Sequence, residues 1–289
     1  MKENKYIYAL GFFDGVHKGH QALLSACREL KGKIGVVTFS GHPQALITGH
    51  QPPLLNTQQD RQRLLTAYGA ENVTFLPFDQ TLMTTPWQDF LAPIAESAAG
   101  FVCGSDFRFG AGGEGTAEKL AAFCKEQGLA CRIVPQQTIR GIRVSSTHIR
   151  ALVESGEMEQ AAEFLGHPHI LSGKVISGRG LGHTIGIPTA NVEIPQGLAL
   201  PKKGVYACKV HTPKGEYRAV TNVGDRPTVD GHHTTVEPWI LDFTDDLYGK
   251  EITVEFYKFL RAEKKFENLE ELKAEIEKNA AETREFFKK

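Results

Sequence analysis

The first part of the chain alternates short apolar runs with amphipathic segments. The apolar runs are rich in β-branched or aromatic residues and short enough for buried strands. They span residues 6–11, 34–39, 73–76, 101–104 and 130–134. The segments between them, of which 58–68 is the clearest, predict helices that join parallel strands. This part is therefore expected to fold as an open α/β sheet, with a further pair of helices after Ser146.

The pattern changes after residue 166. Glycine and proline now separate short β-rich runs at residues 173–176, 204–210, 217–223 and 252–260, a pattern typical of a small antiparallel barrel. Residues 268–287 carry Glu, Lys, Ala and Leu at helical spacing, which predicts one amphipathic helix packed against that barrel. A chain of 289 residues can hold two cores, so we expect domains at residues 1–166 and 167–289.

Composition narrows the classes of function. Lys and Arg number 33 against 34 Asp and Glu without a block of like charge, which gives no reason to expect a nucleic-acid or membrane partner. The apolar run at 6–13 is short and leads directly to Asp14, so it indicates a buried strand and not a signal or membrane span. The 5 cysteines include no Cys-x-x-Cys pair and fit a reducing cytoplasm. The oligomeric state stays open.

The first candidate site is the segment 11–20, which reads GFFDGVHKGH and runs from the first predicted strand into a helix. Backbone N–H groups at such a helix start bind phosphate, and the glycines permit close approach. His17 and His20 are one helical turn apart, so both rings can face one ligand and stabilise charge on a phosphate oxygen. The alternative is a glycine turn with two solvent-exposed histidines.

Three further segments, at 38–43, 104–110 and 144–150, fall at or near predicted carboxyl ends of strands, where open α/β sheets bind ligands. We expect them to share one cleft. In the third, hydroxyl groups at a helix start and Arg150 one turn later suit a triphosphate, although helix capping explains the hydroxyls equally well. For Arg108 the alternative is a structural ion pair with Asp106.

The second part of the chain has its own set of motifs. A glycine-rich segment at 173–182 leads to the sequence PTAN at 188–191, which suits a flap over phosphates with Thr189 as an oxygen ligand for Mg²⁺. Taken alone, the glycines between 178 and 182 could also mark hairpin turns. Further motifs follow at residues 222–228, 235–243, 247–249 and 259–261.

These motifs, in this order over both parts of the chain, resemble the bifunctional riboflavin kinase/FAD synthetase family of bacteria. The resemblance implies a Rossmann-like nucleotidyltransferase domain followed by a six-stranded antiparallel barrel with a C-terminal helix. It implies ATP-dependent phosphorylation of riboflavin to FMN, and adenylylation of FMN to FAD with release of pyrophosphate. The substrates and products would be riboflavin, FMN, FAD and ATP, with Mg²⁺ accompanying ATP.

The resemblance also implies roles for individual residues. His17 and His20 would be catalytic in adenylyl transfer, and Glu237 would be the base that accepts the proton of the riboflavin hydroxyl. ATP phosphates in the first domain would be bound by Gly11, Phe13, Asp14, Gly19, Ser146, Thr147 and Arg150. The FMN and adenine pocket would contain His42, Asp106, Phe107 and Arg108. The kinase would bind ATP through Gly178, Gly180, Gly182, Thr189 and Asn191, the last two at Mg²⁺, and riboflavin through Asn222, Trp239 and Arg261.

The chain departs from the family pattern beside Glu237. Pro238 and Trp239 stand where a small or apolar residue and then His are common, and a proline in a strand removes a ladder donor. Asn279 stands where an acidic residue is usual, and the pair His232 and His233, with no third donor nearby, is expected in an exposed loop.

Three interpretations therefore remain. The chain has both activities, or it is an FAD synthetase with a weak or inactive kinase, or it is a binding protein that senses flavin or nucleotide. Glu237 taken alone could be an ordinary carboxylate on a strand face. The presence of His17, His20 and Glu237 together favours an enzyme.

Overall fold

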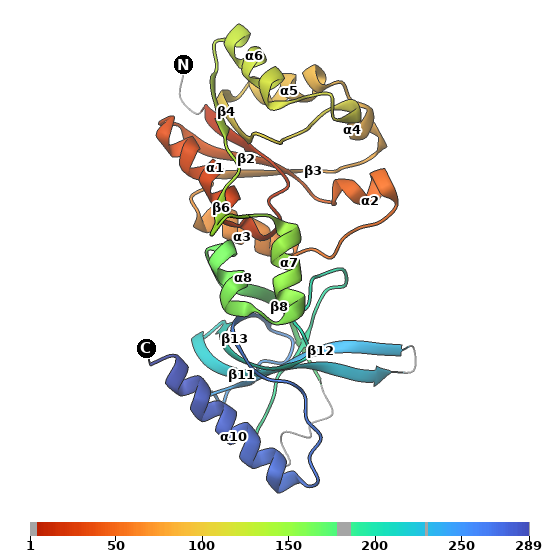
Figure 1. The fold of residues 1–289 in the computed structure, drawn as a ribbon, viewed down its shortest axis with the longest axis vertical. Helices are drawn as coiled ribbons and strands as arrows, with labels where there is room; N and C mark the ends of the chain where they lie inside the picture. Colours follow the sequence, from red (N-terminus) through yellow and green to blue (C-terminus); the bar gives the residue numbers. More distant parts are fainter. Residues whose placement is uncertain (1–4, 178–185, 229–230, 289) are drawn as a thin grey trace. The chain divides into compact units, whose positions relative to one another are not determined.

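The computed structural model describes residues 5–177, 186–228 and 231–288 (Figure 1). The chain forms two compact units, which are described separately. The first contains Met1–Leu54 and Gln58–His148, and the second contains Leu55–Thr57 and Ile149–Lys289.

The first unit is built on an open sheet of parallel strands. Its order is β3 (Asn72–Leu76), β2 (Lys33–Phe39), β1 (Tyr6–Leu10), β4 (Ala98–Gly104) and β5 (Ala130–Val134). The expected open α/β sheet is confirmed. Because all the strands run the same way, the turns that leave β1, β2 and β4 lie at the same edge of the sheet.

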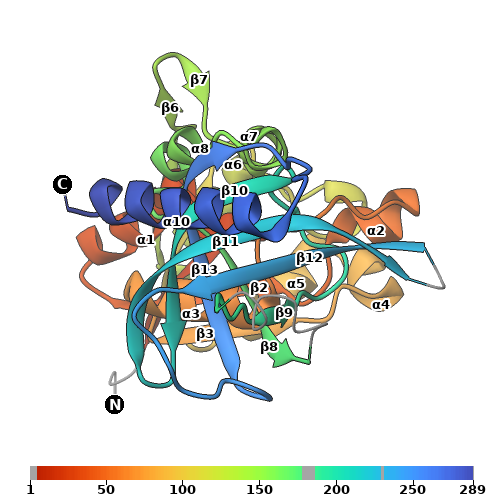
Figure 2. The ribbon, with the colours of Figure 1, turned by 90° about the horizontal axis from the view of Figure 1, so that it is seen from below.

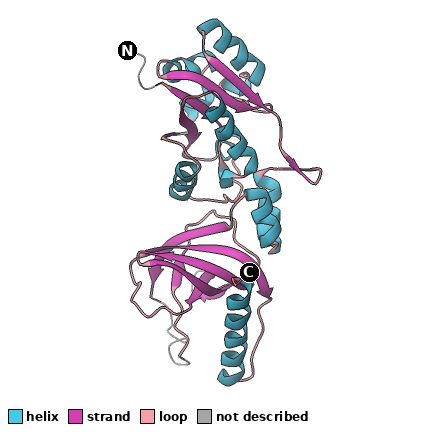
Figure 3. Ribbon diagram, turned by 90° about the vertical axis from the view of Figure 1, so that its left-hand side faces the viewer, coloured by secondary structure: helices cyan, strands magenta, loops and turns pink. Residues whose placement is uncertain are grey.

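Helices cover both faces of this sheet (Figure 3). Side chains alternate between the faces along a strand, so Ile7 and Ala9 pack with α1 (Lys18–Glu29) and α3 (Gln58–Ala67). Tyr8 and Leu10 point to the other face, which is covered by α4 (Gln80–Thr84), α5 (Trp87–Ala95) and α6 (Ala117–Gln127). Smaller elements of this unit are η1 (Asp14–Val16), α2 (Pro43–Thr48), η2 (Ala111–Gly113), β6 (Thr138–Ile139) and β7 (Ile142–Arg143).

The second unit contains a closed barrel. Around the barrel the strands are β10 (Gly204–Thr212), β11 (Gly215–Thr228), β12 (Gly231–Ile240), β9 (Asn191–Glu193), β8 (His169–Ile176) and β13 (Glu251–Arg261). Neighbouring strands are antiparallel, which confirms the expected six-stranded barrel. Large apolar side chains such as Tyr206, Val254 and Phe256 are fully buried in it.

Three helices complete the described chain. The expected pair after Ser146 is present as α7 (Ser146–Ser155) and α8 (Met158–Leu165). The C-terminal helix α10 (Leu269–Phe286) begins after Asn268, whose side chain accepts the amide N–H of Glu271 at 2.9 Å. Figure 2 shows α10 along β10 and β11, where Ala280 packs with Val205 and Val220, so the predicted helix against the barrel is confirmed.

Candidate active sites

The backbone between β1 and α1 makes an unusual turn. Phe13 has φ 60°, Gly15 φ 80° and Val16 φ 39°, so two non-glycine residues adopt left-handed conformations. Such conformations cost free energy and persist only where the surrounding structure holds them, often at functional sites. The turn brings His17 to the start of α1 and leaves Asp14 buried.

His17 and His20 lie together at this helix start. Their rings stack with centroids 3.6 Å apart and planes 12° apart. The amide N–H of His20 donates to Nδ1 of His17 at 3.3 Å, so His17 caps α1. A Cβ on Gly19 would lie 3.1 Å from the His17 ring, which is a tight contact. His17 is only 7% exposed, so the alternative of two solvent-exposed histidines is wrong.

Electrostatics keep the His20 ring neutral. Burial lowers its pKa well below 6.5, and the neighbouring His17 and Arg61 lower it further. Among the described residues, no group bonds to Nδ1 of His20, which is itself buried. A neutral ring in this position can still donate or accept one hydrogen bond toward a ligand.

The residues predicted to border FMN and adenine follow two strands of the first unit: His42 follows β2, and residues 106–108 follow β4. His42 packs its ring edge-on against Phe12, with centroids 4.6 Å apart, beside the turn that follows β1. Asp106 follows β4, and its carboxylate pairs with Arg143 and accepts from the Gln136 amide at 3.3 Å. The ion pair considered for Asp106 is therefore made with Arg143 and not with the exposed Arg108. Phe107 stacks on the buried Phe109, with centroids 5.5 Å apart.

The start of α7 is joined to the turn after β1. The hydroxyl of Ser146 donates to the main-chain oxygen of Asp14 at 2.9 Å. Ser145 accepts the amide N–H of His148 at 3.3 Å, so the capping interpretation holds for Ser145. Thr147 is in this first turn of α7, and Arg150 lies on the same helix within the second unit.

Two neighbouring cavities lie among the described residues of the second unit, and the first is called the Trp239 cavity. It has a volume of about 370 Å³ and lies where α10 and the 261–266 segment meet the barrel. Its lining includes Thr189, Asn222, Glu237, Trp239, Arg261, Phe266, Leu272, Ile276 and Asn279. The predicted base and the three predicted riboflavin contacts, which come from β11, β12 and β13, therefore share one cavity.

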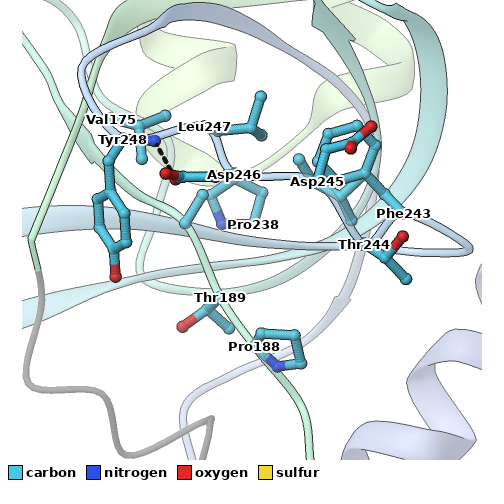
Figure 4. A pocket seen from close by; sticks show the side chains of 12 residues that line it. Val175, Pro188, Thr189, Pro238, Phe243, Thr244, Asp245, Asp246, Leu247 and Tyr248 are labelled. Atoms are coloured by element: carbon cyan, nitrogen blue, oxygen red, sulfur yellow. Dashed lines mark hydrogen bonds between the residues drawn. The ribbon is translucent and has the colours of Figure 1, made fainter.

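The second, here the Tyr248 cavity, has a volume of about 310 Å³ (Figure 4). Its lining includes Val175, Pro188, Thr189, Pro238, Ile240, Phe243, Asp245, Asp246, Leu247 and Tyr248. The amide N–H of Tyr248 donates to Asp246 Oδ1 at 2.8 Å, which shapes the loop on one side. Along β12, Glu237 and Trp239 line the first cavity and Pro238 and Ile240 the second, as strand alternation requires. Thr189 lines both.

The unusual Pro238 leaves the β11–β12 ladder intact. Its main-chain oxygen accepts the amide N–H of Ala190 at 2.9 Å. The N–H and C=O of one strand residue point to the same side, so the missing donor of Pro238 faces the β9 side and not Thr221 on β11. The expected loss of a ladder donor therefore does not interrupt pairing between β11 and β12.

The unusual Asn279 keeps an acceptor at its position. Arg261 Nε donates to Asn279 Oδ1 at 3.0 Å and lies 3.6 Å from Glu275 Oε1. The amide oxygen thus provides the hydrogen bond, and the nearby carboxylate on α10 provides the negative charge.

Some predicted residues cannot be placed in this geometry. Gly178, Gly180 and Gly182 lie outside the described residues, as do the side chains of His232 and His233. Asn191 is the first residue of β9 and pairs with Ile176 on β8. None of the helices that the structure describes combines the length and apolar character needed to cross a membrane.

Comparison with known proteins agrees with this division of sites. Residues 1–148 match the family model described as FAD synthetase, and residues 165–287 match the one described as riboflavin kinase. The chain is 34% identical to the bifunctional riboflavin kinase/FMN adenylyltransferase of Listeria monocytogenes, covering 98% of this chain and 93% of that protein. It is 36% identical to the protein of the same name from Escherichia coli K12, covering 97% and 92%.

A solved structure supports the fold of the whole chain. It is called a macrolide-efflux protein from Streptococcus pneumoniae and matches with a TM-score of 0.87 at 30% identity, covering 98% of this chain and 94% of that one. The name of that protein differs from those of the sequence relatives, and the likeness concerns the fold.

An α/β unit that matches FAD synthetases, followed by a barrel unit that matches riboflavin kinases, defines a bifunctional transferase. The chain belongs to the family of bifunctional riboflavin kinase/FMN adenylyltransferases. It is an enzyme of flavin cofactor biosynthesis that has a riboflavin kinase and an FMN adenylyltransferase activity.

Proposed function

We propose that the kinase reaction takes place at the Trp239 cavity, with riboflavin inside it and Glu237 as the base. The observation that carries this proposal is that Glu237, Asn222 and Arg261 line one cavity from three different strands. The aromatic side chain of Trp239 supplies a flat surface suited to an isoalloxazine ring.

The Tyr248 cavity is the proposed place of ATP. It adjoins the riboflavin cavity at Thr189, so two substrates bound there would meet beside Glu237. The riboflavin hydroxyl oxygen would form a bond to the γ-phosphorus, the bond to ADP would break, and the hydroxyl proton would pass to Glu237. The hydroxyl of Thr189 and the amide oxygen of Asn191 are the oxygen donors that Mg²⁺ prefers. Bound there with ATP, Mg²⁺ would offset negative charge on the phosphate oxygens.

For adenylyl transfer we propose the helix start at His17 and His20 as the ATP phosphate site. The FMN phosphate would attack the α-phosphorus and expel pyrophosphate, a reaction that needs positioning and charge stabilisation and no protein nucleophile. Gly11, Phe13, Asp14 and Gly19 form the turn, and Ser146, Thr147 and Arg150 would complete the phosphate contacts. His42, Asp106, Phe107 and Arg108 would border FMN and adenine. We assign this activity to residues 1–166, the kinase to residues 167–289, and the protein to the cytoplasm.

One alternative has a specific observation in its favour. Pro238 and Trp239 depart from the family pattern beside the base, as expected of an FAD synthetase with a weakened kinase. The uninterrupted β11–β12 ladder and the position of Glu237 in the cavity support an active kinase instead.

Tryptophan fluorescence tests where riboflavin binds. The chain has 2 tryptophans, so Trp87→Phe leaves Trp239 as the only reporter, and Trp239→Phe is the matched control that leaves Trp87 in the first unit. Riboflavin should quench the emission of Trp239 over the concentrations that saturate FMN formation. Unchanged Trp239 emission in a protein that makes FMN would place riboflavin elsewhere.

A further inference from the structure

Arg61 on α3 is among the largest fully buried side chains, at 1% exposure, and it bridges the ends of two strands. Its Nη1 donates to the main-chain oxygen of Phe12 at 2.7 Å, just after β1. Its Nη2 donates to the main-chain oxygen of Phe39 at 2.8 Å, at the end of β2. Burying a charged group costs free energy, and these two hydrogen bonds offset part of that cost.

Further contacts hold the guanidinium in its charged form. It lies over the Phe12 ring at 4.4 Å and over the Phe75 ring at 5.2 Å. Burial lowers the pKa of Arg61 to about 10 and Asp14 opposes that change, so the group stays charged at neutral pH. Arg61 therefore presents a fixed positive charge beneath the turn that carries Asp14.

The Phe12 carbonyl is the point at which this anchor acts. Besides Arg61, the hydroxyl of Thr38 donates to it at 2.8 Å, so two buried donors fix the peptide that precedes the left-handed Phe13. That turn determines where His17 starts α1 and hence where the stacked His20 ring lies. A misplacement on the order of 1 Å at reacting groups can cost about a hundredfold in rate.

We propose that Arg61 is a positioning residue for adenylyl transfer, which fixes the turn that orients His17 and His20 and gives that turn a positive charge. The inference rests on the proposed role of those histidines. Arg61 acts through the Phe12 carbonyl, to which its Nη1 donates, and through its charge.

The test compares three full-length variants in FAD formation from FMN and ATP, with FMN formation from riboflavin in the same protein as internal standard. Arg61→Met removes both donors and the charge, and should lower kcat for FAD formation roughly ten- to a hundredfold. Arg61→Lys keeps the charge and should recover part of the loss. Thr38→Val removes only the neutral donor and should give a smaller decrease. FMN formation should stay unchanged in all three.

The pH profile separates positioning with charge from a simple structural role. Burial lowers the pKa of His20, His17 and Arg61 lower it further, and Asp14 acts in turn on Arg61. Removing the Arg61 charge lets the pKa of His20 rise, so the acid limb of FAD formation should move to higher pH in Arg61→Met. Thr38→Val should leave it in place.

Two results would overturn the inference. The first is FAD formation within about twofold of wild type in folded Arg61→Met, or, if that variant does not fold, unchanged kcat in both Arg61→Lys and Thr38→Val. The second is a lower rate in folded Arg61→Met without a shifted acid limb. If His20→Ala also leaves FAD formation unchanged, the proposed ATP site fails as well; if it lowers it, only the role of Arg61 fails.

Discussion

Glu237 and Asn222 lie directly opposite each other on β12 and β11, and both line the Trp239 cavity. Directly opposed side chains on antiparallel strands are within reach of one another. A riboflavin hydroxyl bound near Glu237 would therefore also lie near Asn222. Within the described chain, no hydrogen bond or ion pair engages the Glu237 carboxylate. A carboxylate in this state can accept a proton from a substrate.

The role of Glu237 as base predicts a loss of turnover without a loss of binding. Glu237→Gln keeps the size and polarity of the side chain but removes its basicity, so kcat for FMN formation should fall by roughly a hundredfold or more with KM little changed. Steady-state kinetics at saturating ATP and Mg²⁺ measure both. FAD formation from supplied FMN is the control and should be unaffected. A wild-type rate of FMN formation would require another proton acceptor.

Trp239 should affect binding and not the chemical step. Its side chain lines the cavity on the same face of β12 as Glu237, so Trp239→His should chiefly change KM for riboflavin, because it alters contacts present in both ground and transition states. Kinetics with varied riboflavin measure this. A fall in kcat with unchanged KM would place Trp239 at the reacting atoms instead.

His20→Ala should act on the other activity. The variant removes a ring at the helix start, where it can stabilise charge that develops on phosphate, and should lower FAD formation by about a hundredfold or more. FMN formation by the same protein is the control and should be spared. If FAD is formed at the wild-type rate, His20 is not at the site.

The sequence was sufficient to predict the fold class of both units, because the spacing of apolar residues in each is regular. Strands β1 to β5 coincide with the predicted apolar runs, and α10 coincides with the predicted amphipathic segment. Strand β12 was not among the predicted runs, since its sequence mixes Gly, His, Thr, Glu and Pro without a clear alternation. Its place is set by pairing with β11, a long-range contact that no local pattern contains.

The candidate sites show the same limit. The histidines and Glu237 stand in recognisable motifs, whereas Arg61 lies in an ordinary amphipathic helix and resembles a surface residue in sequence. The proposed role of Arg61 depends on hydrogen bonds to the main-chain oxygens of Phe12 and Phe39, which lie near Arg61 only in the folded chain. The partner of Asp106 was missed for a related reason, because Arg143 belongs to the hairpin of β6 and β7, two strands of 2 residues each.

His169 should make the second unit sensitive to acid. This residue of β8 is 1% exposed, and burial, aided by His167, lowers its pKa to about 3. Between about pH 6.5 and pH 3 the unfolded chain binds a proton at this residue that the folded chain does not, so stability falls as the pH falls. The decrease should approach about 1.4 kcal/mol per pH unit.

Urea unfolding between about pH 6.5 and 5, above the range where most carboxylates titrate, measures this contribution. His169→Gln should lose that part of the pH dependence. His211→Gln, which removes an exposed histidine on β10, is the matched control and should keep it. Equal pH dependence in His169→Gln and wild type would show that the pKa of His169 is the same in the folded and the unfolded chain.

The presence of two activities in one chain is tested most directly by chromatography of the flavins that the wild-type protein forms. The protein is incubated with riboflavin, ATP and Mg²⁺ in one reaction, and with FMN, ATP and Mg²⁺ in a second. We expect FMN and then FAD in the first reaction, and FAD in the second. The absence of FMN and FAD from the first reaction, with FAD formed in the second, would contradict the claim and leave a single working site in the adenylyltransferase unit.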